Sequence, residues 1–194
     1  MAGRQTRYAI APLFIDRWSP RAFTGEEIPD ETLFTCFEAA RWAASGFNGQ
    51  PWRFIYAKCD AEAWPAFVSL LSSTNQSWAG RAAALVLFVS KTTVAFKGED
   101  IRNPTHSFET GAAWSNFSHQ AQLLGWHTHA MGGFDRVRAQ DELGVPANFA
   151  VEAMAAIGRI GSPESLPSSL REREFPSNRV PLDSLVMEGR FHAE

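Results

Sequence analysis

The sequence predicts a globular chain that mixes helices with strands, arranged around one strand at the centre of a sheet. Of its 194 residues, 45% are hydrophobic and 20% are charged, which is the balance of a folded protein rather than a disordered one. Residues 83–90 form a nearly continuous apolar run without alternation. Such a run is typical of a strand covered on both faces of a sheet. The length suits one domain, which we expect to span residues 1–194.

The first strong helical pattern begins at Pro29-Asp30. Apolar residues then recur at helical spacing, at Leu33, Phe37, Ala40 and Ala44. Gly46 stands where a helix of this length would end. The aromatic and β-branched run Trp52–Lys58 predicts a strand. Asp60 is a candidate cap for a second helix that would reach about Leu71.

Beyond the central strand, residues 107–124 predict a long helix that Gly125 ends. Its apolar stripe consists of Ala113, Phe117, Ala121 and Leu124. A strand over residues 126–131, a short helix over 136–143 and a last strand over 150–157 follow. Gly144 and Pro146 end the short helix.

The last segment, residues 161–194, differs from the rest of the chain. It is rich in Ser, Pro, Glu and Arg and has few residues able to build a core of its own. A segment of this kind is either disordered or wraps across a partner surface. Residues 181–186 are apolar enough to dock, so the second alternative is the better one if the protein is a dimer.

Charge and composition exclude several classes of function. The formal net charge is −3 and no Lys- or Arg-rich run occurs, which argues against nucleic acid as a partner. The longest apolar run, residues 82–89, is far shorter than the roughly 18 residues that a membrane helix needs. Cys36 and Cys59 are too few for a disulfide scaffold. We expect a reduced, cytoplasmic protein without nucleic-acid or membrane partners.

A metal site and a side-chain nucleophile are both poorly supported. His127 and His129 would lie on one face of a strand, but no third ligand occurs at a metal-binding spacing, so no metal is expected. Both cysteines lie inside predicted elements, where a buried thiol is the ordinary outcome. Since no nucleophile–base pair is evident, catalysis would depend on a cofactor rather than on a catalytic side chain.

A cluster of cations precedes the first predicted helix, in Arg17-Trp18-Ser19-Pro20-Arg21. In an extended stretch residues 17, 19 and 21 point the same way. Two guanidinium groups and a hydroxyl on one side suit a phosphate, because Arg offers a fork of donors to its oxygens. The alternative is a solvated loop with scattered charge.

Two further segments combine glycine with polar side chains. Between a helix end and a strand start, Ser45, Asn48 and Gln50 alternate with two glycines and could converge on a polar ring edge; an ordinary helix-ending turn is the alternative. Gly132 and Gly133 follow a predicted strand. They would let the backbone approach a planar ligand and leave an N–H free to donate, or simply form a tight turn.

Together these segments resemble the flavin-dependent nitroreductase family, from about residue 14 to the C-terminus. The Arg-x-Ser-x-Arg stretch at 17–21 is similar to the N-terminal flavin-binding signature of the family. Residues 40–54, ARWAASGFNGQPWRF, are similar to its most recognisable motif. The turn at residues 132–135 and Arg179, ahead of Val-Pro-Leu, match the remaining two motifs in order.

The resemblance implies an α+β fold with a central, mainly antiparallel sheet flanked by helices. It also implies a homodimer with FMN at each subunit interface, and a C-terminal tail (about 161–194) that extends onto the partner subunit. The residues that it assigns to the phosphate, the ribityl chain and the nearby ring edge are Arg17, Trp18, Ser19, Arg21 and Arg179. Ser45, Asn48 and Gln50 would come from the other subunit. Asn75 would contact the pyrimidine side of the ring, and Gly132 and Gly133 would face flavin N5.

The implied activity is hydride transfer from NAD(P)H to flavin N5 and onward to a flat acceptor such as a nitroaromatic or a quinone. Two alternatives are a flavin-binding protein without turnover and an enzyme of this fold with a different flavin reaction. The sequence departs from its relatives in three places. No cation follows Asn75 before Arg81, Ala44 stands where relatives often have proline, and the aromatic Phe47 replaces a smaller or polar residue.

Overall fold

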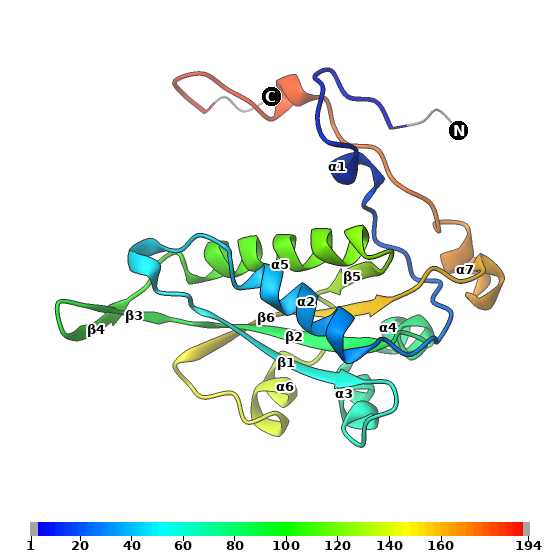
Figure 1. Ribbon diagram of the computed structural model, residues 1–194, viewed down its shortest axis with the longest axis horizontal. Coiled ribbons are helices and arrows are strands. Elements are labelled where there is room, and N and C mark those ends of the chain that lie inside the picture. Colours follow the sequence, from blue (N-terminus) through cyan, green and yellow to red (C-terminus); the bar gives the residue numbers. More distant parts are fainter. Residues whose placement is uncertain (1–3, 192–194) are drawn as a thin grey trace.

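The computed structural model describes residues 4–191 and combines helices with two antiparallel sheets (Figure 1). Residues 1–3 of the predicted domain and residues 192–194 of the predicted tail lie outside the described residues. The helices are α1 (Pro12–Asp16), α2 (Asp30–Ala40), α3 (Trp64–Leu70), α4 (Ser73–Ala79), α5 (His106–Leu123), α6 (Arg136–Glu142) and α7 (Ser168–Arg171). The strands are β1 (Trp52–Lys58), β2 (Ala84–Lys91), β3 (Thr93–Phe96), β4 (Glu99–Arg102), β5 (His127–Met131) and β6 (Phe149–Gly158). Short 3₁₀ turns occur at η1 (Gly46–Asn48), η2 (Pro163–Ser165) and η3 (Leu182–Ser184).

Within residues 4–191 the main sheet has the strand order β1-β2-β6-β5, and neighbouring strands are antiparallel. β2 lies inside the sheet, and its residues 84–90 are all buried, which confirms the prediction of a central strand. The register between β2 and β6 shifts between Phe88 and Val89, which pair with Ala153 and Val151. Glu152 is therefore the unmatched residue of a β-bulge, a device that re-aims a side chain.

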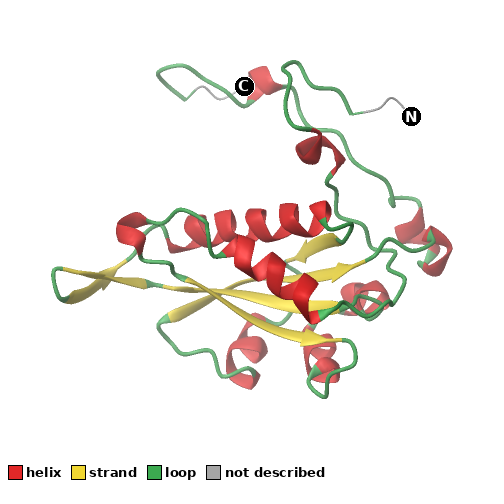
Figure 2. Ribbon diagram, viewed as in Figure 1, coloured by secondary structure: helices red, strands yellow, loops and turns green. Residues whose placement is uncertain are grey.

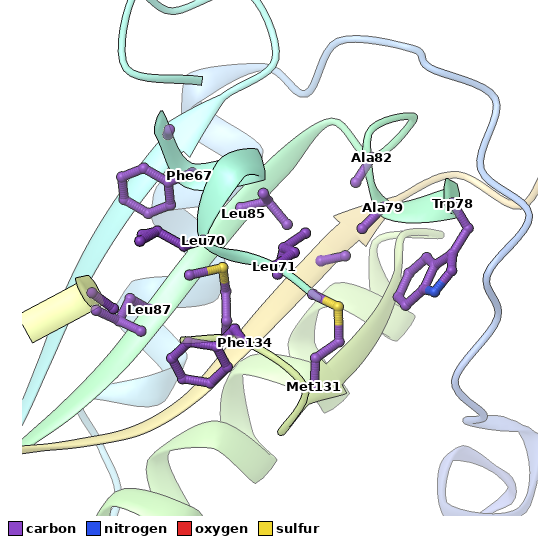
Figure 3. Packing of buried hydrophobic residues seen from close by; sticks show 14 of the residues in the cluster. Phe67, Leu70, Leu71, Trp78, Ala79, Ala82, Leu85, Leu87, Met131 and Phe134 are labelled. Atoms are coloured by element: carbon purple, nitrogen blue, oxygen red, sulfur yellow. The ribbon is translucent and has the colours of Figure 1, made fainter. Parts of the chain in front are cut away.

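Helices cover both faces of this sheet (Figure 2). On one face α2 and α5 pack against the side chains of Val86 and Phe88. On the other face Leu85 and Leu87 pack against α3, α4 and α6, as the close view of Phe67, Leu70 and Trp78 shows (Figure 3). Alternate residues of β2 thus belong to two separate cores. The α+β class with a helix-flanked antiparallel sheet is confirmed.

Most predicted elements are confirmed to within two residues, two are not, and one helix was not predicted. The first helix ends at Ala40 rather than near Gly46. The helix expected to be capped by Asp60 begins only at Trp64, after Ala63, so that assignment was wrong. A separate helix, α4, follows and is capped by Ser72, whose side chain accepts from the Asn75 N–H. Along the described chain, no helix is both long and apolar enough to cross a membrane.

Two arms extend from the body side by side: the N-terminal arm (residues 4–16) and the C-terminal arm (residues 175–191) (Figure 1). Arg4 Nε donates to the Ser177 carbonyl at 3.0 Å, and Arg7 pairs with Asp183 at 2.7 Å. A hollow of about 760 Å³ separates the arms. Its apolar lining residues include Tyr8, Ile10, Phe14, Val180, Leu182 and Leu185.

Candidate functional site

A cationic pocket of about 330 Å³ lies where the two arms join the body. It brings together Arg17, Trp18, Ser19 and Arg21, which follow α1, with Arg179 of the C-terminal arm. Its remaining lining residues are Arg4, His129, Arg173, Phe175 and Ser177. Among the described residues its lining thus holds five arginines and neither Asp nor Glu. We call this cavity the arginine pocket.

The charges of the arginine pocket repel one another. Burial lowers the pKa of Arg17, and the positive charges of Arg179 and Arg4 lower it further. Burial and Arg179 likewise lower the pKa of Arg4, although Asp16 acts in the opposite direction. Guanidinium groups nevertheless stay protonated in proteins. A pocket of mutually repelling cations is stabilised by an anion that neutralises them, and phosphate matches the donor geometry of Arg.

The buried side chain of Glu174 fixes the polypeptide at the edge of the arginine pocket. Its Oε1 accepts from the Arg21 N–H at 2.7 Å and from the Ala22 N–H at 2.8 Å, and its Oε2 lies 3.7 Å from Arg21 Nη1. A bridge between Phe23 and Ile160 continues this docking. The segment that carries Arg21 is therefore held by residues near the other end of the chain.

His129 forms the inner wall of the arginine pocket. Its Nδ1 lies 3.0 Å from the Pro20 carbonyl, and its ring centroid is 4.7 Å from that of Trp78. Burial is the largest cause that lowers the pKa of His129, so the ring is neutral at pH 7 and Nδ1–H is the donor. Within the described residues, no group of three potential metal ligands includes His127 or His129.

Asn75 and Gly133 form a second part of the site. The Gly133 carbonyl accepts from Asn75 Nδ2 and from the Ser72 N–H, each at 2.9 Å. A Cβ atom at position 133 would lie 2.9 Å from Asn75 Nδ2 and 3.1 Å from Ser72 Oγ. The turn after β5 therefore requires glycine at this position because α4 approaches so closely.

The carbonyl groups of the two glycines of this turn have partners within the protein. The Gly132 carbonyl accepts from the Phe134 N–H at 3.1 Å and from Arg136 Nη1 at 3.2 Å. Because a trans peptide is planar, the Gly133 N–H points away from that carbonyl. Among the described residues, neither the Gly132 N–H nor the Gly133 N–H has a hydrogen-bond partner. The turn thus offers free donors to a ligand.

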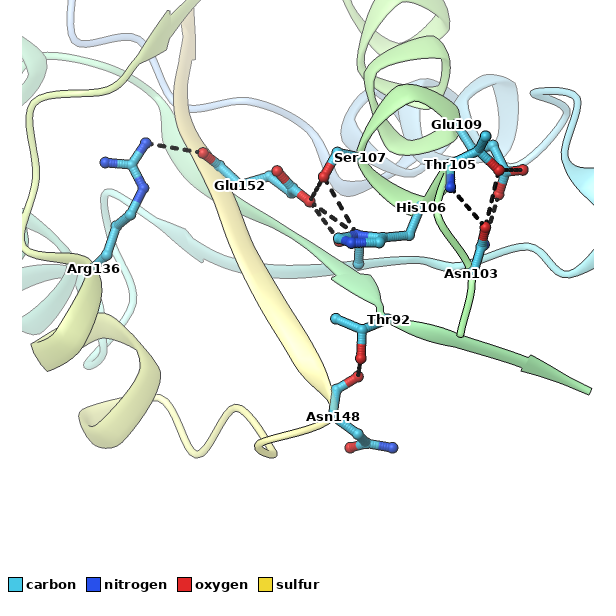
Figure 4. A network of polar contacts seen from close by, with 10 residues as sticks. Thr92, Asn103, Thr105, His106, Ser107, Glu109, Arg136, Asn148 and Glu152 are labelled. Atoms are coloured by element: carbon cyan, nitrogen blue, oxygen red, sulfur yellow. Dashed lines mark hydrogen bonds and ion pairs between the residues drawn. The ribbon is translucent and has the colours of Figure 1, made fainter. Parts of the chain in front are cut away.

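A polar network connects this turn to the start of α5 (Figure 4). Arg136 Nη2 donates to the Glu152 carbonyl at 3.2 Å. The carboxylate of Glu152, aimed by the β-bulge, accepts from Ser90 at 2.5 Å and from Ser107 at 2.7 Å, and His106 Nδ1 lies 2.7 Å from Ser90 Oγ. Sequence reasoning missed this network because the bulge has no sequence signature here.

Ser45, Asn48 and Gln50 lie in one loop between α2 and β1, which we call the Ser45–Gln50 loop. The Gln50 N–H donates to Ser45 Oγ at 3.0 Å, and Gln50 Nε2 donates to the Asn48 carbonyl at 3.2 Å. Phe47, Asn48 and Gln50 have φ values of 53°, 54° and 45°, in the left-handed region that is unfavourable for side chains. Such strain is typical of functional sites.

Within one chain the loop lies far from the arginine pocket. Figure 1 shows η1 beside the β3–β4 hairpin at one end of the molecule, whereas α7 and the bases of the arms lie at the other end. The structure therefore divides the predicted site residues into three groups, of which the first is the five of the arginine pocket and the second is the three of the loop. Asn75, Gly132 and Gly133 form the third, between α4 and β5.

Arg81, the nearest cation after Asn75 in the sequence, faces elsewhere. Its Nε donates to the Phe23 carbonyl at 3.3 Å and its Nη2 to the Thr24 carbonyl at 3.5 Å. Arg81 thus holds the N-terminal segment against the sheet. The cation beside the glycine turn is Arg136, which the sequence did not single out.

A family model for the nitroreductase family matches residues 15–159. The chain belongs to the nitroreductase family. A solved structure described as an oxidoreductase containing FMN is 48% identical, with a TM-score of 0.95, over 98% of this chain and 97% of that one. A Desulfovibrio desulfuricans protein solved in complex with FMN is 23% identical, with a TM-score of 0.73, over 95% of this chain and 100% of that one. A curated Thermus thermophilus protein named NADH dehydrogenase is 23% identical, over 89% of this chain and 92% of that protein.

Membership of the nitroreductase family confirms the prediction of a flavin oxidoreductase. The residues of this chain also fit FMN, because the arginine pocket would supply cations for its phosphate and the glycine turn would offer unpaired N–H donors to its ring. The sequence analysis did not assign four further residues to this site, namely Arg4, His129, Arg173 and Glu174. Their convergence depends on the docking of the two chain ends, which no local pattern reveals.

Proposed function

We propose that this nitroreductase-family chain, as a single domain, is an FMN-dependent oxidoreductase that takes a hydride from NAD(P)H and passes it to a flat acceptor such as a nitroaromatic or a quinone. The observation that carries the proposal is the arginine pocket, in which five arginines from both ends of the chain meet without an acidic lining residue. A dianionic phosphate satisfies such a pocket. The Thermus thermophilus relative named NADH dehydrogenase supports a nicotinamide reductant.

In this proposal the chain positions the reactants rather than reacting itself. Arg17, Ser19, Arg21 and Arg179 hold the FMN phosphate, with Trp18 beside the ribityl chain. When bound, FMN supplies an N5 atom that accepts and donates hydride. Asn75 meets the pyrimidine side of the ring.

The Gly132 and Gly133 N–H groups are the donors that the proposal assigns to flavin N5. The Gly132 carbonyl, which shares a peptide plane with the Gly133 N–H, already has partners inside the protein, so the Gly133 N–H keeps a fixed direction. Preorganised donors of this kind act without reorganisation during the reaction. No side-chain acid or base is needed for the hydride step.

The proposal includes a homodimer in which Ser45, Asn48 and Gln50 reach the flavin site of the partner. Two observations support it. The Ser45–Gln50 loop lies at the opposite end of its own chain from the arginine pocket, and both arms expose apolar side chains, among them Tyr8, Leu185 and Val186. Exposed apolar arms are typical of an interface. A monomeric mass in sedimentation at micromolar concentration would contradict the shared site.

The position of the Phe47 side chain supports the proposal that the acceptor is a flat molecule. Its side chain is 72% exposed, and its ring centroid lies 4.9 Å from that of Phe96 in β3. An exposed ring backed by a second ring offers a stable face for stacking with a planar molecule. In the proposed dimer this face borders the partner's flavin ring.

The test is an anaerobic reduction followed by absorbance spectroscopy. The purified protein loaded with FMN is expected to lose its absorbance near 450 nm on addition of NADH or NADPH. It should regain this absorbance when a nitroaromatic or a quinone is added. Bleaching and recovery together would establish the reductase cycle and its direction.

Other results would favour the alternatives. A yellow protein that neither reductant bleaches would support a flavin-binding protein without turnover. Bleaching without recovery by either acceptor would support a different flavin reaction on the same fold. A chain that takes up no FMN would contradict the proposed function. A cytoplasmic location stays a prediction from the sequence.

A further inference from the structure

The Ser45–Gln50 loop needs an external support. Phe47, Asn48 and Gln50 all have left-handed backbone conformations, and residues held in such conformations persist only where their surroundings determine them. Hydrogen bonds within the loop, such as Gly49 N–H to the Gly46 carbonyl at 2.9 Å, close the turn. They do not fix the loop relative to the sheet.

Arg53 Nη1 donates to the Gln50 carbonyl at 3.0 Å at one end of the loop, and at the other end the support comes from Glu109 in the first turn of α5. Its Oε1 accepts from the Gly46 N–H at 2.8 Å, across 63 positions of the sequence. Thr105 Oγ1 lies 2.7 Å from the same oxygen, and Asn103 Nδ2 donates to Oε2 at 3.1 Å. Figure 4 shows this carboxylate between Asn103 and Thr105 at the start of α5.

Glu109 is an unusual residue to find at this place. It is only 4% exposed, and among the described residues it forms no ion pair. A buried carboxylate without a cation is costly unless hydrogen bonds satisfy it. Burial alone would raise the pKa of Glu109, but the hydrogen bonds from Gly46, Thr105 and Asn103 outweigh burial and lower it. Glu109 is therefore ionised at neutral pH.

The anchor of this carboxylate is rigid. Asn103 is 4% exposed and its N–H donates to the Thr92 carbonyl at 2.8 Å, so it is tied to the end of β2. Its Oδ1 accepts from the Thr105 N–H at 3.0 Å. The position of Gly46 is thus set by the junction of β2, β4 and α5 rather than by the loop itself.

We propose that Glu109 is a positioning residue, which holds the Ser45–Gln50 loop in the conformation that completes the flavin site of the partner subunit. This inference rests on the proposed function, because it takes the shared FMN site as given. Glu109 does not touch the flavin. It acts through Gly46, whose neighbours Ser45, Asn48 and Gln50 make the contacts.

Two substitutions at Glu109 remove different numbers of its hydrogen bonds and should weaken FMN binding to different extents. In Glu109→Gln the amide oxygen can still accept from Gly46, while the amide nitrogen faces Asn103 Nδ2, a donor against a donor. Glu109→Ala removes every acceptor. We expect the Kd for FMN to rise by about threefold in Glu109→Gln and by about tenfold or more in Glu109→Ala.

A matched control separates positioning from general destabilisation of α5. Ser118 is a buried residue of the same helix, and its Oγ lies 2.7 Å from Thr128 Oγ1, away from the loop. Ser118→Ala is expected to lower Tm without changing the Kd for FMN. A Kd that rises in Ser118→Ala as much as in Glu109→Ala would overturn the inference.

The decisive measurement is complementation in mixed dimers. Subunits carrying Glu109→Ala are combined with subunits carrying Arg17→Ala through two affinity tags, and FMN is titrated into the purified heterodimer. If Glu109 acts across the interface, one site receives an intact arginine pocket from one subunit and an intact loop from the other. We expect half of the sites to bind FMN with wild-type affinity, although both homodimers bind weakly.

The outcomes distinguish the inference from the proposed function. No wild-type site in the heterodimer, or an unchanged FMN affinity in Glu109→Ala, would overturn the role of Glu109 while leaving the oxidoreductase assignment intact. A wild-type chain that binds no FMN would overturn both. The readout is cofactor binding, so it does not depend on the identity of the acceptor.

Discussion

In the proposed FMN site, the arginine pocket and the Ser45–Gln50 loop would contribute to ligand binding in opposite ways. The pocket gathers flexible cationic side chains that repel one another, and a ligand would relieve that repulsion. The loop has no net charge, and its backbone is already held in a strained form by a buried carboxylate. The arginine pocket would recognise a ligand by its charge, and such recognition tolerates small displacements of the side chains. The Ser45–Gln50 loop would recognise a ligand by its shape, and such recognition does not tolerate displacements of the backbone.

Removing charge from the arginine pocket is expected to have the largest effect. A hydrogen bond to a charged group is worth about 1.5 to 3 kcal/mol. The double variant Arg17→Ala/Arg179→Ala should therefore raise the Kd for FMN by about 100-fold or more. Quenching of FMN fluorescence on titration measures this Kd.

Salt and a surface variant serve as controls for this effect. Wild-type affinity should fall as ionic strength rises, because salt screens charge pairs, and the double variant should show a weaker salt dependence. Arg138→Ala removes a surface cation that pairs with Glu142 at 2.8 Å and should change neither quantity. A double variant with wild-type affinity would contradict the assignment of the pocket.

A change of shape at the glycine turn is expected to have the next largest effect. Gly133→Ala places a Cβ atom 2.9 Å from Asn75 Nδ2, so α4 and the turn must separate. We expect a loss of about 1 to 3 kcal/mol in the free energy of unfolding, measured by urea denaturation. FMN affinity should fall at the same time.

Gly111→Ala is the matched control for that substitution. Gly111 lies inside α5, and a Cβ atom added there would have no neighbour within 4 Å. Alanine should therefore stabilise the helix by about 0.5 to 1 kcal/mol. Opposite signs for the two Gly→Ala changes would show that the requirement at position 133 is local. A stabilising Gly133→Ala would refute it.

Acidification is expected to weaken the contact between Glu109 and the Ser45–Gln50 loop, whereas the arginines of the pocket stay protonated. Because the pKa of Glu109 is lowered in the folded chain, its ionised form contributes stability that is fully present above the ordinary carboxyl pKa. That contribution is lost as pH falls through the lowered pKa. The difference in unfolding free energy between wild type and Glu109→Gln should therefore shrink from about pH 7 to about pH 3. A difference that grows on acidification would contradict this sign.

Phe47→Ala is expected to have the smallest effect. The exposed Phe47 ring contributes to stacking alone, which is worth about 0.5 to 1.5 kcal/mol. We expect KM for flat acceptors to rise by a few-fold, and KM for bulky ones to stay unchanged. Equal effects on flat and bulky acceptors in steady-state assays would argue against a stacking role.

The elements with a strong periodic pattern were predictable from the sequence. β2 and α5 agree with their predicted ranges to within one residue, because burial on both faces and a regular apolar stripe leave few alternatives. α4 was missed because its residues, STNQSWA, are polar apart from the last two. Tertiary packing of Trp78 against Phe23 and His129 compensates for that weak local preference.

The site was predictable where its residues are close in sequence. The alternation at Arg17, Ser19 and Arg21 indicated an anion site. Arg4 and Arg173 join it only because the chain ends dock together. No sequence pattern indicated a role for Glu109, since a single acidic residue in the first turn of a helix is common. Its role depends on a contact with Gly46 that only the fold creates.

The arginine pocket is lined by residues near both ends of the chain, so during synthesis one half of it exists before the other. Arg21 and its anchor Glu174 are 153 positions apart, and this contact joins the two sides of the pocket. At a synthesis rate of about 5 to 20 residues per second, this separation corresponds to roughly 8 to 30 s of translation. The nascent chain therefore carries Arg17 and Arg21 of the pocket long before it has Arg173 and Arg179. If this pocket holds FMN as proposed, cofactor loading follows the synthesis of Glu174, because a chain cut short before this residue would lack the contact that holds Arg21.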